Sequence, residues 1–176
     1  MKVSAIERKY NTRIHAKLRD LREFFTADPL NPEAQAAEAY LFLSKLKAIL
    51  GNLNNDLSYV ATLMAKEYLS RQFDISCFDA AAKPQGASGI DVEFHTPDGK
   101  RIAAEIKTTF PYQPGFGAKQ REMISKDIDK LKKSSADVKF LFLTEELSFE
   151  SVKKVRAWTG AGVRVVLLPG GEELTL

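Results

Sequence analysis

Two stretches of alternating apolar and polar residues flank a tight turn near the middle of the chain. Residues 90–96 alternate with the two-residue period of a β-strand. The Pro97-Asp98-Gly99 sequence then predicts a turn, because proline fixes one backbone angle and glycine supplies another. Residues 101–109 alternate again and keep their apolar side chains on one face. We therefore expect an antiparallel hairpin in which the numbers of paired residues sum to about 197.

The first 70 residues have a helical period instead. In residues 3–25 apolar side chains recur at spacings of three and four, with lysine and arginine between them. Asn31 and Pro32 suit the start of a second helix, which is expected to end at Gly51. A third helix is expected over residues 56–71. The chain is thus predicted to contain an N-terminal helical arm, residues 1–55, and an α/β core, residues 56–176.

The core is expected to continue as alternating helices and strands around one sheet. Apart from the hairpin, the expected elements are a short strand over 73–78, a basic helix over 118–134, a buried strand over 137–144, a helix over 148–158 and a strand over 163–168. From residue 56 the order is helix, three strands, helix, strand, helix and strand. This order is typical of a single α/β domain.

Composition and charge exclude some classes of protein and leave others open. With 176 residues, 44% of them apolar and 28% charged, the chain can form one ordinary hydrophobic core. No apolar stretch reaches the roughly 18 to 20 residues of a membrane span, and the N-terminal residues lack the apolar centre of a signal peptide. The single cysteine, Cys77, cannot form an internal disulfide bond. We therefore expect a cytoplasmic protein without a membrane partner.

Lysine and arginine gather in two segments, although the net charge is only +3. Residues 1–24 carry seven of them against three acids, and residues 118–139 carry seven against four. Such segments are compatible with a polyanionic partner. Two solvated helix faces explain them equally well.

The hairpin brings Asp91, Glu105 and Lys107 into one neighbourhood. Glu105 and Lys107 share one face of their strand. Asp91, on the preceding strand, is expected opposite about residue 106, and a one-residue choice of register decides which face of the sheet its side chain occupies. Two carboxylates, with the Ile106 carbonyl as a further oxygen, are the ligands that Mg²⁺ prefers. A metal there can activate water toward a phosphate, and a lysine can orient that water or stabilise charge. The pattern therefore indicates phosphodiester hydrolysis; the alternative is a solvent-facing Glu–Lys pair.

Asp91 followed by Glu105-Ile106-Lys107 on an apolar strand resembles the motif of the PD-(D/E)XK nuclease superfamily, which includes restriction endonucleases and Holliday-junction resolvases. The resemblance implies a restriction-endonuclease-like αβββαβ core with a mixed sheet, here residues 56–144. It implies that Asp91 and Glu105 bind Mg²⁺ and that Lys107 assists the attacking water. The family's proline before the aspartate is Ile90 here. The family often adds an acid from its first core helix, and Glu67 or Asp56 would supply it.

The segment after the motif is a candidate for nucleic-acid binding. Residues 108–120 combine glycine, proline, aromatic and amide side chains, and they resemble segments that follow the catalytic lysine in some restriction enzymes. Gln113 and Gln120 would reach a base edge or a phosphate. Lysine and arginine of the basic helix would contact phosphates, namely Lys119, Arg121, Lys126 and Lys130. A plain connection and a solvated helix face are equally good explanations.

The expected function is that of a Mg²⁺-dependent endodeoxyribonuclease that cuts double-stranded DNA, most simply a type II restriction endonuclease. Cutting both strands with one small site predicts a homodimer, with the N-terminal helices as its contact or as a clamp on DNA. A junction-resolving or repair nuclease of the same superfamily is the nearest alternative. A non-catalytic DNA-binding or assembly module is another, and a purely helical interaction protein with an incidental hairpin is a third.

Overall fold

The computed structural model describes residues 3–27, 33, 35–76, 78–83, 87–109 and 117–176. The chain divides into two compact units, Val3–Asp56 and Leu57–Leu176. In the part of the chain that the structure describes, every helix is too short or too polar to cross a membrane.

The N-terminal unit is built from two helices that contact each other, α1 (Ala5–Ala27) and α2 (Ala36–Leu50). A capping box starts α1: the Glu7 backbone N–H donates to Ser4 Oγ at 3.0 Å, and the Ser4 N–H donates to Glu7 Oε2 at 2.7 Å. The rings of Phe24 and Phe42 join the two helices, with centroids 4.7 Å apart. The expected start of the second helix at Asn31 and Pro32 lies outside the described residues.

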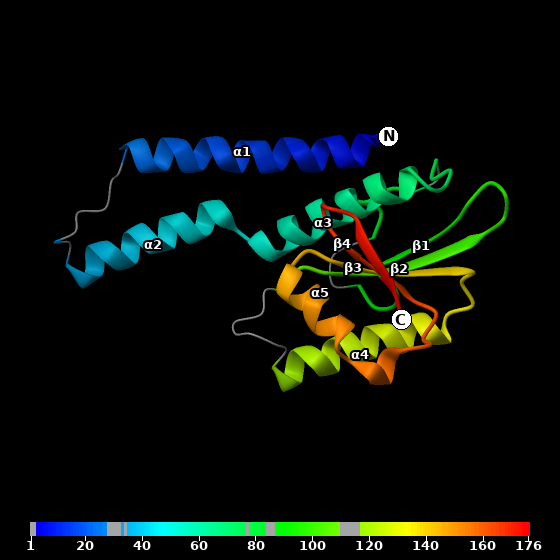
Figure 1. The fold of residues 1–176 in the computed structure, drawn as a ribbon. Helices are drawn as coiled ribbons and strands as arrows, with labels where there is room; N and C mark the ends of the chain where they lie inside the picture. Colours follow the sequence, from blue (N-terminus) through cyan, green and yellow to red (C-terminus); the bar gives the residue numbers. More distant parts are fainter. Residues whose placement is uncertain (1–2, 28–32, 34, 77, 84–86, 110–116) are drawn as a thin grey trace. The chain divides into compact units, whose positions relative to one another are not determined.

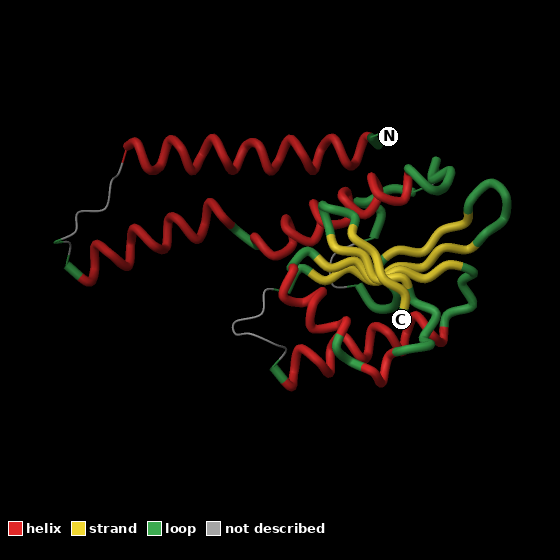
Figure 2. Tube along the Cα trace, viewed as in Figure 1, coloured by secondary structure: helices red, strands yellow, loops and turns green. Residues whose placement is uncertain are grey.

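One mixed sheet forms the centre of the second unit. Its strands lie in chain order, β1 (Val92–His95), β2 (Arg101–Lys107), β3 (Val138–Leu143), β4 (Arg164–Leu167) and β5 (Glu172–Thr175) (Figure 2). The outer pairs, β1–β2 and β4–β5, are antiparallel, whereas β2–β3 and β3–β4 are parallel. Each parallel step needs a crossover, and the helices α4 (Ala118–Lys133) and α5 (Glu146–Lys153) provide the two crossovers. The expected α/β class and mixed sheet are therefore confirmed.

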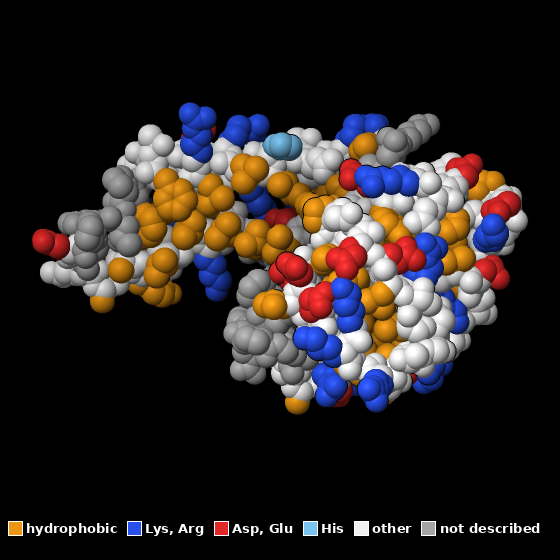
Figure 3. Space-filling view, in the orientation of Figure 1, with side chains coloured by type: hydrophobic (Ala, Val, Ile, Leu, Met, Phe, Trp, Pro, Cys, Tyr) orange, Lys and Arg blue, Asp and Glu red, His pale blue; other side chains and the backbone are white. Residues whose placement is uncertain are grey.

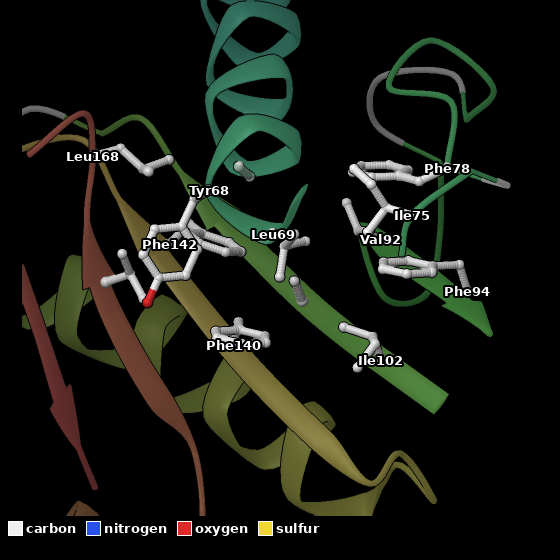
Figure 4. Close-up of a cluster of buried hydrophobic side chains, with 13 residues drawn as sticks. Tyr68, Leu69, Ile75, Phe78, Val92, Phe94, Ile102, Phe140, Phe142 and Leu168 are labelled. Carbon is white, nitrogen blue, oxygen red and sulfur yellow. The ribbon is translucent and has the colours of Figure 1, made fainter. Parts of the chain in front are cut away.

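Two hydrophobic cores lie on the two faces of this sheet. On one face, residues of α3 (Leu53–Ser70) such as Tyr68 and Leu69 pack against Ile102, Phe140 and Phe142 (Figure 4). On the other face, α4 and α5 cover the sheet (Figure 1). Each fully buried side chain of this size contributes about 1.5–3 kcal/mol to folding. The sheet is thus fixed on both sides, and its strand ends form a rigid frame for side chains.

The expected hairpin is confirmed, but the prediction of a strand before it is wrong. Gly99 has a φ of 85°, the left-handed conformation that the turn requires of glycine. The strand expected over residues 73–78 does not exist in its described residues, because the backbone there forms turns after α3. Ile75 and Phe78 are nevertheless buried in the core, so their apolar spacing reflects loop side chains that pack inward. Between α3 and α4 the described residues therefore form two strands, not three.

The C-terminal part of the core also differs in detail from expectation. The helix expected over 148–158 is α5 followed by a short 3₁₀ turn, Arg156–Trp158. The expected strand over 163–168 is β4. The edge strand β5 was not expected, because Glu172 and Glu173 interrupt any apolar alternation there. On an edge strand, charged side chains facing solvent are tolerated.

Candidate active site

The hairpin register decides where Asp91 lies. Val92 pairs with Ala104 and Phe94 with Ile102, so paired numbers sum to 196, one less than expected. Continuing this register by one residue sets Asp91 opposite Glu105. Asp91 directly precedes β1, and its carboxylate lies within hydrogen-bonding reach of Glu105, which faces Lys130 of α4. The Asp91 carboxylate is anchored by the Ile106 backbone N–H, which donates to Oδ2 at 2.9 Å.

Glu105 is a buried carboxyl group with an unusual pKa. Only 1% of the residue is exposed. Burial, the charges of Asp91 and Asp127, and a hydrogen bond with Asp91 raise its pKa to about 8, while the charge of Lys130 opposes the shift. Two carboxylates that meet in this way require a proton or a cation between them. Perturbed groups of this kind are concentrated at functional sites.

Helix α4 adds a carboxylate that the sequence analysis missed. Asp127 is buried, and its Oδ2 lies 2.8 Å from Lys107 Nζ in an ion pair. Lys130 Nζ reaches both Asp127 Oδ1, at 3.2 Å, and Glu105 Oε1, at 3.3 Å. The signal was present in the sequence, because Asp127 falls on the apolar stripe formed by Ile124, Ile128 and Leu131. An acid at such a position marks either a buried ion pair or a site.

A cavity of about 160 Å³ opens beside these residues. Asp91 and Lys107 form part of its wall. Ser58 and Thr62 contribute hydroxyl groups from successive turns of α3, and Phe78 forms an apolar side. Asp91 and Lys107 therefore border open space, whereas the buried Glu105 does not line the cavity.

The side chains present fit a magnesium ion better than a zinc ion. Asp91 and Glu105 offer carboxylate oxygens, and the described residues that line the cavity include neither histidine nor cysteine. Within the described ranges, no group of three or more His, Cys, Asp or Glu side chains converges to hold a metal. Mg²⁺ is commonly held by one or two carboxylates and keeps several waters, whereas structural zinc requires four protein ligands. The donor set is thus that of a hydrated, oxygen-bound cation.

The two helix acids considered from the sequence lie elsewhere. Glu67 is exposed on α3 and is not part of the cavity wall. Asp56 belongs to the N-terminal unit, where its Oδ2 lies 2.5 Å from Lys17 Nζ and its Oδ1 lies 3.5 Å from Arg13. Instead, α3 brings Ser58 and Thr62 to the cavity.

The candidate DNA contacts are distributed over the start of α4. Lys119, Arg121 and Lys126 are exposed, and Lys126 pairs with Glu122 at 2.6 Å. Gln120 lines a small apolar pocket together with Lys107 and Thr109, so it lies close to the site. Gln113 lies outside the described residues. Exposure leaves the three cations accessible, which is compatible with a phosphate contact and with a solvated helix face alike.

Comparisons of the chain with models of protein families, with curated proteins and with solved structures found no match. What the site can do chemically therefore follows from its own side chains.

Proposed function

We propose that this protein is a Mg²⁺-dependent nuclease that hydrolyses DNA phosphodiester bonds. The observation that carries the proposal is the position of Asp91 opposite Glu105 with Lys107 on the same strand, beside an open cavity. Asp91, Glu105 and the Ile106 carbonyl would hold the ion. Bound there, Mg²⁺ supplies Lewis acidity toward a phosphoryl oxygen and toward the attacking water.

The chain's own groups account for the remaining requirements of the reaction. Asp91 is oriented before substrate arrives, because the Ile106 N–H holds one of its oxygens. Lys107 lines the cavity and is partly exposed, and its ammonium group would donate to the attacking water or to a phosphoryl oxygen as charge develops on it. The sheet and α4 bury Glu105, so this part of the site excludes water and strengthens electrostatic interactions within it.

The restriction-endonuclease-like assignment is supported by the order that follows the hairpin. The second half of the αβββαβ core consists of a hairpin, a helical crossover and a parallel strand. The elements β1–β2, α4 and β3 agree with it in this order. The first of the three strands is lacking among the described residues, so the agreement is partial. A type II restriction endonuclease is the first candidate that we propose within this superfamily. A junction-resolving or repair nuclease is the second candidate, because the same site serves all three.

A second copy of the chain is the partner that we assign to the N-terminal helices. No residue of α2, all of which the structure describes, is buried. Apolar side chains gather over α1 and α2 (Figure 3), and six of them are more than half exposed: Ile6, Leu18, Phe25, Tyr40, Leu41 and Leu43. An exposed apolar surface on this scale marks an interaction site. A two-fold contact there would bring two active sites to one duplex.

The decisive experiment is cleavage of unmethylated genomic or phage DNA by the purified protein with Mg²⁺ and with EDTA. Discrete fragments are expected with Mg²⁺ alone, and none from Asp91→Asn or Lys107→Met. Matched controls are Asp129→Asn, an exposed acid of α4, and Lys154→Met, an exposed lysine after α5; both are expected to cut normally. Intact DNA at micromolar parent protein would contradict the proposal, and a mobility shift without cleavage would favour a binding module. Branched and single-stranded substrates separate a resolvase or repair enzyme from a restriction enzyme.

A further inference from the structure

Asp127 occupies a position where the fold alone would favour an apolar residue. It lies between Ile124 and Ile128 on the buried stripe of α4, and 4% of its side chain is exposed. A carboxylate in such surroundings is strongly disfavoured unless cations compensate its charge. Its presence therefore requires an explanation in terms of its partners.

Both Asp127 oxygens face an ammonium group. Oδ2 lies 2.8 Å from Lys107 Nζ, and Oδ1 lies 3.2 Å from Lys130 Nζ. Lys130 continues to Glu105 at 3.3 Å, so the charges alternate in sign along Lys107, Asp127, Lys130 and Glu105. Lys130 enters from solvent with 45% of its side chain exposed, whereas 21% of the Lys107 side chain is exposed. The better shielded of the two lysines is thus the one that Asp127 approaches most closely.

We propose that Asp127 is a positioning residue: it fixes the Lys107 ammonium beside Asp91 and Glu105, and Lys130 serves as its second counter-charge. The proposal rests on the function proposed above. A lysine has a flexible four-carbon stem, so its amine adopts one place only when a partner holds it. Asp127 acts through Lys107, because its Oδ2 lies in an ion pair with that ammonium group. The alternative is that the ion pairs only fasten α4 to the sheet.

The first test reads the position of Lys107 without any reaction. In ¹H–¹⁵N spectra that detect lysine ammonium groups, a shielded, ion-paired Lys107 is expected to give a slowly exchanging signal, assigned by its loss in Lys107→Arg. Asp127→Asn is expected to abolish that signal. Asp129→Asn, which removes an exposed acid two residues further along α4, is expected to preserve it. A Lys107 signal unchanged in Asp127→Asn would overturn the proposal.

The second test separates positioning from a structural role by a double-mutant cycle. In Mg²⁺-dependent cleavage, Asp127→Asn is expected to lower kcat by about 10- to 100-fold with little change in KM, as for other residues that orient a catalytic group. In a Lys107→Met background, followed at enzyme concentrations high enough to measure its residual rate, the same substitution is expected to have no further effect. An equal loss in both backgrounds, together with a lower Tm, would show that Asp127 only fastens the helix and would overturn the proposal.

The two tests distinguish failure of this inference from failure of the proposed function. A parent protein that cleaves no nucleic acid contradicts the nuclease, yet the ammonium spectra still decide whether Asp127 holds Lys107. If the parent protein cleaves DNA and Asp127→Asn is fully active, the proposed nuclease function is supported and the positioning role of Asp127 is contradicted.

Discussion

Replacing Glu105 by glutamine is expected to stabilise the protein in the absence of metal while abolishing its proposed activity. Glu105 is buried against a second carboxylate, and its pKa is raised from the ordinary 4.5 to about 8. The folded protein therefore binds a proton at this group more tightly than the unfolded chain does. In consequence the contribution of Glu105 to stability falls as the pH rises from about 4.5 to about 8. A neutral amide of the same shape carries no such penalty.

The size of the effect follows from the distance between the working pH and the ordinary pKa. At pH 7 that distance is about 2.5 pH units, which corresponds to about 3 kcal/mol. Glutamine loses the ion pair with Lys130, and this loss offsets part of the gain in stability. We therefore expect Glu105→Gln to raise the free energy of unfolding by about 1 to 3 kcal/mol at pH 7, and by much less at pH 5.

Urea unfolding in EDTA at pH 5, 6, 7 and 8 measures this difference. Glu122→Gln, which changes an exposed acid of α4, is the control and is expected to have little effect at any pH. Added Mg²⁺ is expected to stabilise the parent more than Glu105→Gln, because the variant has lost one carboxylate ligand. A Glu105→Gln variant that is less stable than the parent at pH 8 would refute the claim that the buried charge of Glu105 is only partly compensated.

Three further predictions concern the fold and the assembly. Phe142→Ala, which empties a fully buried position between β3 and α3, is expected to cost about 3–5 kcal/mol in urea unfolding; a loss below about 1 kcal/mol would contradict the packing described. Arg164 holds Glu173 by two contacts, 2.6 and 2.8 Å, and lowers the pKa of Glu173. The stabilisation by this largely exposed pair is below about 1 kcal/mol and is fully present above pH 4.5, so the stability difference between the parent and Glu173→Gln should shrink as the pH falls below 4.5. Leu41→Gln is expected to convert a dimer to a monomer in light scattering, and a parent that is monomeric at any concentration would contradict the assignment of a second copy to α2.

The hairpin was predictable because its signals are local and agree with one another. Alternation over residues 90–96, a Pro-Asp-Gly turn and renewed alternation leave few other structures for this segment. The register was wrong by one residue, since turn geometry and not alternation decides it. That single residue determines whether Asp91 lies opposite Glu105 or opposite Ile106. Sequence thus indicated that Asp91 and Glu105 are neighbours, and the structure was needed to pair them and to add Asp127.

The strand expected over residues 73–78 failed for a different reason. Apolar residues at every second position bury their side chains in a loop as readily as in a strand, because the core requires only that the side chains point inward. The backbone becomes a strand only if a neighbouring strand offers free N–H and C=O groups for hydrogen bonds. That neighbouring strand lies far away in the sequence, so the local pattern does not reveal it. Here Phe78 packs its ring against Phe94 of β1, with centroids 5.3 Å apart, without extending the sheet.

Asp127 shows how a conflict between local pattern and residue type can indicate a site. Its neighbours on α4 specify an apolar stripe, and β2 likewise buries Glu105 among alanines and isoleucine. Each carboxylate opposes folding where it lies, and each is compensated by a lysine that comes from the other element: Lys107 for Asp127 and Lys130 for Glu105. Helix and strand are therefore joined by crossed ion pairs in which Asp127 is the shared member: its replacement removes a partner of Lys107 and of Lys130, whereas Lys130 keeps Asp127 when Glu105 is replaced. Buried charges linked in this way are expected where they are retained for chemistry, because apolar side chains would stabilise the same interface at least as well.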